Sequence, residues 1–218
     1  MKFKKILKSR DKTYTKILKH CLIDMEKIKN PIIINIGAYV GNFAQAILKT
    51  HDKYLIYAIE PSPISYKILK KRFKKDKKII TINAAVSDKN GKVPFYNAGG
   101  KKCDSLIKKF TRGKKENVVK TVVKAITIRS LFEKYKIGKV DLLKINCEGG
   151  EYVLFDDCEY LDNVKNVCIE FHNSPEFGKI REKRPDIMKI LEKDFTLQVG
   201  VIDSVGIDII PQYWKRKQ

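Results

Sequence analysis

Residues 31–41 read PIIINIGAYVG, and this stretch decides the fold. Its apolar, β-branched run predicts a buried strand, which two glycines four residues apart, Gly37 and Gly41, bring to an end. A glycine lets a ligand approach the backbone and lets the next helix begin close to the strand. The polar Asn35 lies inside the run, where a buried strand rarely carries an amide. We therefore expect a strand that ends at a binding crevice.

Helix and strand patterns alternate after this stretch. Apolar runs bounded by polar turns predict the strands, and one-face apolar spacing predicts the helices between them. Such alternation predicts an α/β fold: a mostly parallel sheet with right-handed crossovers and helices on both faces. The expected elements are the core strands 32–36, 54–60, 79–86, 140–146 and 164–172, a further strand over 118–126, and the helices 41–50, 63–75 and 127–135.

Several further segments have weaker patterns. KVPFYN is predicted to add a strand, GGEYVLFDD a short helix, and Thr127 to cap the helix that follows it. Residues 97–117 are charged and glycine-containing, and we expect them to fold over a ligand. The remaining expectations are a helical stretch over 174–194 interrupted at Pro185, and two final strands, FTLQVGVI and GIDIIP.

The chain has 218 residues, which suits one domain with a short extension. Residues 1–29 predict a basic amphipathic helix, and residues 30–218 a single catalytic domain. The start of the sequence lacks the apolar region of a signal peptide, and no apolar run is long enough to cross a membrane, so a cytoplasmic location is expected. The five cysteines show no metal-ligand or disulfide spacing and are interpreted as reduced thiols.

The formal charge of +21 is concentrated in one half of the chain. Residues 1–124 contain 31 Lys and Arg against 9 Asp and Glu, whereas residues 125–218 contain 15 against 16. Such a basic half can neutralise the phosphates of RNA, a lipid surface or a phosphorylated substrate. A general richness in lysine explains the same composition, so charge alone names no partner.

Polar residues follow each predicted core strand. In an open α/β sheet, ligands bind beyond the carboxyl ends of the strands. The GxxxG spacing of Gly37 and Gly41 matches neither the dinucleotide pattern nor a phosphate-binding P-loop. Glu60 ends the second strand about twenty residues later, where a carboxylate accepts hydrogen bonds from ribose hydroxyls. The pair of features predicts an adenosine-type ligand.

An ordered set of motifs resembles the FkbM-type family of class I S-adenosylmethionine-dependent methyltransferases. The matching stretches are INIGAYVGNFA, AIEPSPISYKILKK, AAVSDKNGKVPFY, the block from VKAITIRS to CEGGEYVLFDD, and IEFH, which together span roughly residues 31–172. The resemblance implies a Rossmann-like, seven-stranded sheet with an antiparallel final strand. It also implies S-adenosylmethionine (SAM) as the cofactor and O-methylation of a hydroxyl on a sugar, glycolipid or small molecule.

The resemblance assigns cofactor-binding positions residue by residue. By position, Gly37 and Gly41 would line the methionine part of SAM, and Glu60 would bind its ribose. The family usually has Asp at the positions of Asn35 and Asn146, and often Asn at that of Tyr39; Asn keeps the acceptor oxygen but loses the charge. The other implied positions are Pro61, and Asn83 and Ala84 near the adenine.

The candidate catalytic residues are His172, Glu148 and Glu170. His172 ends a core strand at the crevice, and its ordinary pKa suits a general base that removes a hydroxyl proton; a helix-capping role is the alternative. Alternation places Glu170 and His172 on the same side of their strand. With no acid at position 146, we expect the carboxylates to orient the imidazole rather than bind a metal.

Other polar residues receive structural interpretations. His20 and His51 are predicted to lie at the surface. Lys144, inside a buried strand, is expected to pair with Glu148 or Glu170.

Two alternatives to a small-molecule methyltransferase stay open. The first is an RNA methyltransferase that uses the basic residues 1–124. The second is a degenerate methyltransferase fold that binds a partner or a membrane through its basic N-terminal helix. The sequence leaves the acceptor and the oligomeric state open, and the N-terminal helix has three possible places: on its own sheet, over the crevice, or against a second copy.

Overall fold

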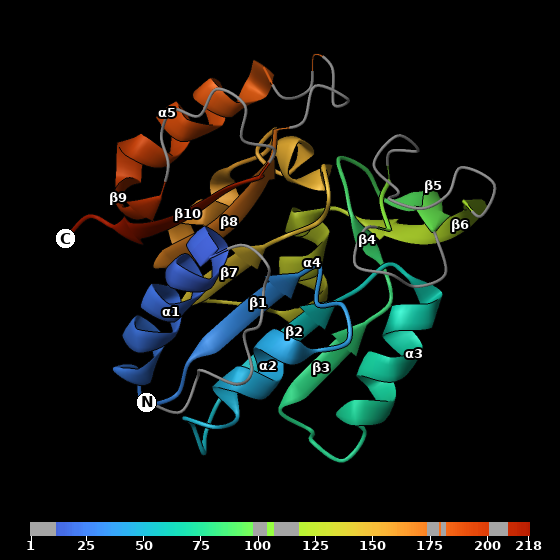
Figure 1. The fold of residues 1–218 in the computed structure, drawn as a ribbon, viewed down its shortest axis with the longest axis horizontal. Helices are drawn as coiled ribbons and strands as arrows, with labels where there is room; N and C mark the ends of the chain where they lie inside the picture. The colour runs from blue at the N-terminus through green and yellow to red at the C-terminus, as the bar shows by residue number, and fades with distance from the viewer. Residues whose placement is uncertain (1–11, 98–103, 107–117, 174–178, 180–181, 201–208) are drawn as a thin grey trace.

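The computed structural model describes residues 12–97, 104–106, 118–173, 179, 182–200 and 209–218. Its centre is a seven-stranded sheet in the order β3-β2-β1-β7-β8-β10-β9 (Figure 1). The first five strands in this order pair in parallel, and β10 is antiparallel to both of its neighbours. The strands are β1 (Ile32–Ile36), β2 (Leu55–Ile59), β3 (Ile79–Ile82), β7 (Leu142–Ile145), β8 (Asn166–His172), β9 (Phe195–Gly200) and β10 (Ile209–Arg216). The predicted Rossmann-like sheet with an antiparallel final strand is confirmed.

Both faces of the sheet are covered, because strand residues alternate between two apolar clusters. Ile33 packs with α1 (Lys12–Glu26), α2 (Asn42–Ile47) and α3 (Pro63–Arg72). Ile34, the next residue, packs on the other face with α4 (Ile128–Tyr135), the 3₁₀ helix η4 (Glu159–Asn163) and α5 (Arg184–Asp194). β1 is therefore a central strand, which explains its continuous apolar run.

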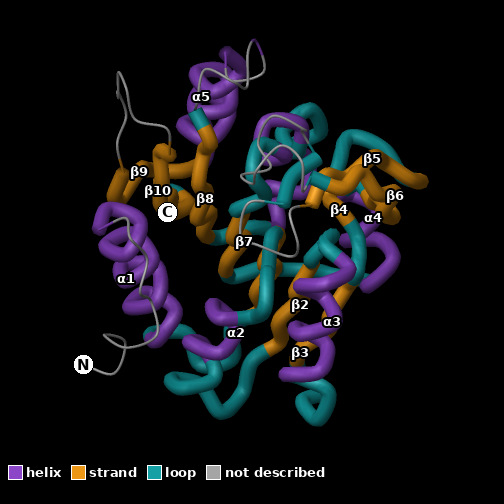
Figure 2. Tube along the Cα trace, turned by 45° about the vertical axis from the view of Figure 1, so that its right-hand side comes forward, coloured by secondary structure: helices purple, strands orange, loops and turns teal. Residues whose placement is uncertain are grey.

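A second, three-stranded sheet has the order β4-β6-β5, with β4 (Ala85–Val86), β5 (Gly91–Asn97) and β6 (Val119–Ile126). Figures 1 and 2 show it on the side of the molecule opposite α1. The single strand predicted over 79–86 is therefore wrong: β3 ends at Ile82, and Ala85 pairs with Ala125 in the smaller sheet. KVPFYN is a strand, as predicted.

The helix α1 packs on β8, β9 and β10 of its own sheet. Four side chains of one helical face are buried: Leu18, Cys21, Leu22 and Met25. His20 is exposed, as predicted, but His51 is 8% exposed, and its Nε2 lies 2.9 Å from the carbonyl oxygen of Met25 at the end of α1. The surface prediction for His51 is wrong because α1 covers it. Residues 1–11 lie outside the described residues.

Two helix starts clarify the sequence signals. Thr127 caps α4, since its side chain accepts a hydrogen bond from the backbone N–H of Ser130, as predicted. Pro185 does not interrupt a helix; it lies in the first turn of α5, where its missing N–H costs nothing.

GGEYVLFDD contains the short 3₁₀ helix η3 (Gly150–Val153), in the place where a short helix was predicted. Most of the predicted ligand-covering segment, 98–103 and 107–117, lies outside the described residues.

The four cysteines in the described part of the chain are free thiols. Within the same residues, the helices are too short or too polar to cross a membrane.

Candidate active site

The cofactor cradle, defined as Asn35, Gly37, Tyr39, Gly41 and Glu60, lies at the carboxyl ends of β1 and β2. Two backbone hydrogen bonds fix the loop that follows β1: the N–H groups of Gly37 and Ala38 both donate to the carbonyl of Ile59. Gly37, Tyr39 and Gly41 all have positive φ angles of 75°, 51° and 89°. The loop is therefore a compact turn that exposes backbone groups at the sheet edge.

Packing within the protein requires glycine at positions 37 and 41, whether or not a ligand is bound. A Cβ on Gly37 would lie 1.6 Å from the carbonyl oxygen of Asn146, and a Cβ on Gly41 would lie 2.3 Å from the Phe73 ring on α3. The first missing side chain lets β7 pass close to the loop, and the second lets α3 pack on it. Their predicted contact with a methionine chain would involve backbone atoms.

Glu60 connects the loop to the start of α3. Its Oε2 accepts from the N–H of Tyr39 at 2.7 Å, and its Oε1 accepts from the N–H of Ser62 at 2.9 Å. Burial raises the pKa of Glu60 to about 7, against the lowering effect of these two bonds. Each carboxylate oxygen keeps a second lone pair, so the group retains acceptor capacity for the hydroxyls of a ribose.

The predicted adenine-side residues gather beside Glu60. The Asn83 side chain donates to the carbonyls of Glu60 at 2.8 Å and Pro61 at 3.2 Å. Ala84 is buried in the main core, so only its backbone is available to a ligand. Sequence reasoning missed Asp104, which accepts from the Ser62 hydroxyl at 2.9 Å; its place in a charged segment gave no signal of this contact.

Asn35 of the cradle and Lys144 form a buried polar layer in the sheet. They are partners in the β1–β7 register, and both are buried. Among the described residues, neither amide atom of Asn35 has a hydrogen-bond partner, and Lys144 forms no ion pair with Glu148 or Glu170. Burial lowers the pKa of Lys144, and its Nζ lies 5.6 Å from the centre of the Phe43 ring. Asn146, at the end of β7, donates its N–H to Ile36.

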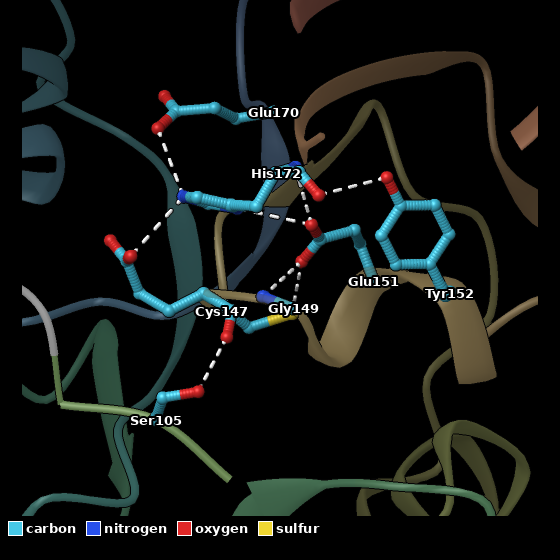
Figure 3. Close-up of polar contacts among 8 residues, drawn as sticks. Ser105, Cys147, Gly149, Glu151, Tyr152, Glu170 and His172 are labelled. Carbon is cyan, nitrogen blue, oxygen red and sulfur yellow. Dashed lines mark hydrogen bonds and ion pairs between the residues drawn. The ribbon is translucent and has the colours of Figure 1, made fainter. Parts of the chain in front are cut away.

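The His172 cluster, defined as His172, Glu148, Glu151 and Glu170, lies at the carboxyl ends of β7 and β8 (Figure 3). The Nε2 atom of His172 is 3.3 Å from Glu148 Oε2 and 3.6 Å from Glu170 Oε1. On the other side of the ring, Nδ1 is 3.0 Å from Glu151 Oε1, which also accepts the His172 backbone N–H at 2.7 Å. The structure thus brings together all three predicted catalytic residues.

The carboxylates determine the protonation of this cluster. Burial alone would lower the pKa of His172, but the charges of Glu151 and Glu148 outweigh it and raise the pKa well above the ordinary 6.5. Burial raises the pKa of Glu170 to about 7, although His172 and Lys144 act in the opposite direction. The arrangement holds a proton on the imidazole and is able to exchange another near neutral pH.

Two supporting residues were not predicted as site residues. Glu151 is fully buried, and its Oε2 accepts the Gly149 N–H at 2.9 Å. Ser105 donates its hydroxyl to the carbonyl of Glu148 at 2.6 Å. The repeated acid in CEGGE was the one signal for Glu151, whereas nothing in the sequence near Ser105 pointed to the site. Within the described residues, no group of three or more His, Cys, Asp or Glu side chains is arranged to hold a metal ion.

The seven-stranded sheet, parallel except at β10, is the fold of the class I SAM-dependent methyltransferases. Solved structures with this fold include the precorrin-6y C5,15-methyltransferase of Geobacter metallireducens GS-15, with a TM-score of 0.53, 11% identity, and 99% of this chain and 92% of that chain covered. A second is magnesium protoporphyrin IX methyltransferase from Synechocystis PCC 6803, solved with bound SAM. Its TM-score is 0.52 and its identity is 10%, with 94% of this chain and 78% of that chain covered. These likenesses show the fold alone.

Sequence comparison identifies the family. The methyltransferase FkbM domain matches residues 35–197, so the chain belongs to the FkbM methyltransferase family, and the predicted resemblance is confirmed. It is also similar to methyltransferase sdnD of Sordaria araneosa, with 25% identity over an alignment 183 residues long that covers 69% of this chain and 70% of that protein. Membership of this methyltransferase family indicates SAM as the methyl donor.

The residues present fit that cofactor. Glu60 has acceptor capacity left for ribose hydroxyls, and the amide of Asn35 is buried beside the cradle without a partner in the described structure. When bound, SAM supplies an electrophilic methyl group on a sulfonium. The residues that would hold SAM and a group of carboxylates therefore lie at adjoining strand ends.

Proposed function

We propose that this protein transfers the methyl group of SAM to a hydroxyl on a sugar, glycolipid or other small molecule. The observation that carries the proposal is the His172 cluster, which places ionisable groups at the ends of β7 and β8, next to the cradle at the ends of β1 and β2. A hydroxyl is a weak nucleophile, and it benefits from a group that receives its proton as the new bond forms.

In this proposal, residues at the ends of β1 and β2 bind the cofactor, and residues at the ends of β7 and β8 act on the acceptor. Glu60, Tyr39 and the backbone of the glycine loop would hold the cofactor, and the polar layer of Asn35 and Lys144 would lie beneath it. The His172 cluster would receive the proton of the acceptor. Fixed positions of this kind supply much of the rate enhancement in a displacement reaction.

A screen with radiolabelled SAM tests the proposal. The purified full chain is incubated with panels of sugars, glycolipids, small phenols and RNA, and label in each product is counted. Transfer to a hydroxyl compound is the expected result, and any product excludes the degenerate, binding-only alternative. Transfer to RNA alone, or to no acceptor by folded protein, would contradict the proposal.

A second candidate, RNA methylation, is favoured by one feature at the opposite edge of the sheet. A cavity of about 640 Å³ lies beside α3, near the amino ends of β2 and β3, with Arg72, Lys75, Lys77 and Lys78 in its lining. Two of these cations are held in place: Arg72 donates to the Asn42 side chain at 2.9 Å, and Lys78 lies 4.8 Å from the centre of the Tyr54 ring. Such a site suits phosphates.

Salt dependence distinguishes this candidate. If the cavity binds an RNA backbone, the affinity falls steeply with salt, and the double variant Lys75→Glu/Lys77→Glu binds RNA much more weakly. Lys189→Glu/Lys193→Glu, on the distant helix α5, is the charge-matched control. Equal loss in both double variants, or an affinity that salt does not change, would count against RNA as the substrate.

A further inference from the structure

The hydrogen bonds around Glu151 define the state of the His172 ring. Both oxygens of this buried carboxylate act as acceptors: Oε1 from the backbone N–H of His172 and Oε2 from the N–H of Gly149, at 2.7 and 2.9 Å. A carboxylate offers no proton to its neighbours, so the Nδ1 of His172, 3.0 Å from Oε1, must carry a hydrogen and donate it.

The other nitrogen of the ring faces two more carboxyl groups. Nε2 is 3.3 Å from Glu148 Oε2 and 3.6 Å from Glu170 Oε1. In a neutral ring with its hydrogen on Nδ1, the Nε2 lone pair would point toward the Glu148 carboxylate and be repelled by it. A proton on Nε2 converts this contact into an attraction, and the raised pKa of His172 agrees with this geometry.

We propose that Glu148, rather than His172, accepts the proton of the acceptor hydroxyl, and that His172 is a fixed cation that positions the Glu148 carboxylate. The proposal rests on the O-methyltransferase function given above. Within the cluster, the Glu148 side chain is 20% exposed, against 8% for Glu170, 4% for His172 and 0% for Glu151. Glu148 is therefore the most exposed member of the cluster and the one that a bound acceptor would reach.

The backbone at Glu148 forms an unusual turn that fixes the position of this residue. Glu148 has φ +50°, a conformation that non-glycine residues adopt rarely, and Gly149 follows with φ +96°. The Ser105 hydroxyl donates to the Glu148 carbonyl at 2.6 Å and holds this turn. Strained backbone of this kind persists where surrounding contacts fix it, and it is common at functional sites.

Other charged groups near the ring come from the neighbouring strands. Lys144 on β7 lowers the pKa of Glu170, and Glu170 lies two residues before His172 on β8. The Cys147 thiol lies 3.7 Å from Glu151 Oε2, and burial raises its pKa, which keeps it neutral. These groups leave His172 as the cation in direct contact with Glu148.

The reaction balances with Glu148 in this role. The acceptor oxygen forms a bond to the methyl carbon while the carbon–sulfur bond breaks and leaves its electron pair on sulfur. The hydroxyl proton passes to the Glu148 carboxylate, which later releases it to water. His172 keeps both of its protons throughout and is a positioning residue, as is Glu151.

Nitrogen NMR of the full chain tests the charge state without any acceptor. The protein is labelled with ¹⁵N-histidine, and His172→Gln identifies the ring signals. Both nitrogens of His172 should be protonated at pH 7.5, with and without S-adenosylhomocysteine, and Glu148→Gln should shift the titration of the ring to lower pH. A bare ring nitrogen at pH 7.5 would overturn the proposal and return the base role to His172.

Kinetics separate the two roles once the screen supplies an acceptor. Glu148→Gln should lower kcat at least about 100-fold, as loss of a general base does, with a SAM affinity within about threefold of the original. Glu148→Asp should recover part of the rate. His172→Gln should reduce kcat less than Glu148→Gln does, and the kcat of this variant should still decrease at low pH. Near-normal turnover in Glu148→Gln would overturn the proposal. If the wild-type protein methylates no hydroxyl, the proposed function is overturned instead, and the NMR experiment still decides the charge state of His172.

Discussion

The cofactor cradle and the His172 cluster lie at the same sheet edge but are built in different ways. In the cradle, side chains bind the backbone: Glu60 accepts two backbone N–H groups, and Gly37 makes room for a carbonyl. In the cluster, side chains act mainly on one another, across contacts of 3.0 to 3.6 Å between His172 and three carboxylates. The cradle therefore depends on chain geometry and the cluster on charge, so substitutions should separate folding effects from titration effects.

The largest effect is expected for Gly37→Ala. The new Cβ would lie 1.6 Å from the Asn146 carbonyl oxygen in a residue with φ +75°, and the backbone must move to relieve this contact. We expect a loss of at least about 4 kcal/mol in the free energy of unfolding, or no folding, measured by chemical denaturation. Gly138→Ala, with nothing within 4 Å of the new atom, is the control and should change stability by less than about 1 kcal/mol. Equal stability of the two variants would contradict the close approach of β1 and β7.

A smaller effect is expected for Glu60→Gln. The amide has one acceptor oxygen, so its NH₂ group must face the N–H of either Tyr39 or Ser62, and the bonds to ribose lose their charge. Charge-assisted hydrogen bonds contribute about 1.5–3 kcal/mol, which corresponds to about a 10- to 100-fold weaker SAM affinity by calorimetry. Asp162→Asn, at an exposed position on η4, should bind SAM like the original protein. Unchanged affinity in Glu60→Gln would remove Glu60 from the cofactor site.

The His172 cluster is tested by Glu170→Gln as a function of pH. The pKa of Glu170 rises from 4.5 to about 7 in the folded protein, so folding binds a proton in this range and the contribution of Glu170 to stability falls as pH rises from about 4.5 to 7. The variant lacks this loss. Its stability relative to the original protein should therefore increase by about 1–2 kcal/mol between pH 5 and pH 8. A difference that stays constant with pH would show that Glu170 is not held in a carboxylate-rich, buried site.

The smallest effect is expected for Asn35→Asp, which restores an acid next to Lys144 in the β1–β7 register. The carboxylate would gain a buried cationic partner and a site for the ammonium group of SAM. We expect about two- to fivefold tighter SAM binding, equivalent to about 0.5–1 kcal/mol. Asn163→Asp, an exposed change of the same kind, is the control. Weaker binding in Asn35→Asp would indicate that the asparagine is adapted to this site.

The cradle was predictable from sequence because its signals are local. An apolar run, a positive-φ glycine and an acid after the next strand define it, and the family motifs place each residue. The mostly parallel main sheet followed from the strand–helix alternation, and its antiparallel final strand followed from the family resemblance. The proximity of His172, Glu148 and Glu170, the predicted catalytic residues, could be foreseen because strand ends converge at one edge.

The remaining features depend on contacts between distant segments. The two-residue strand Ala85–Val86 pairs with β6 about forty residues later, and no local pattern distinguishes it from the end of β3. The burial of His51 depends on the position of α1, and the role of Glu151 depends on the backbone N–H of His172. The protonation of His172 follows from three distances that no spacing in the sequence records.

Calorimetric titration of the folded full chain with SAM tests the central claim most directly, because it needs no acceptor and reports on the cradle itself. The account predicts saturable binding of one SAM per chain. It also predicts competition by S-adenosylhomocysteine, since the ribose contacts with Glu60 do not involve the methyl group. An absence of binding, with circular dichroism showing that the protein is folded, would contradict the account.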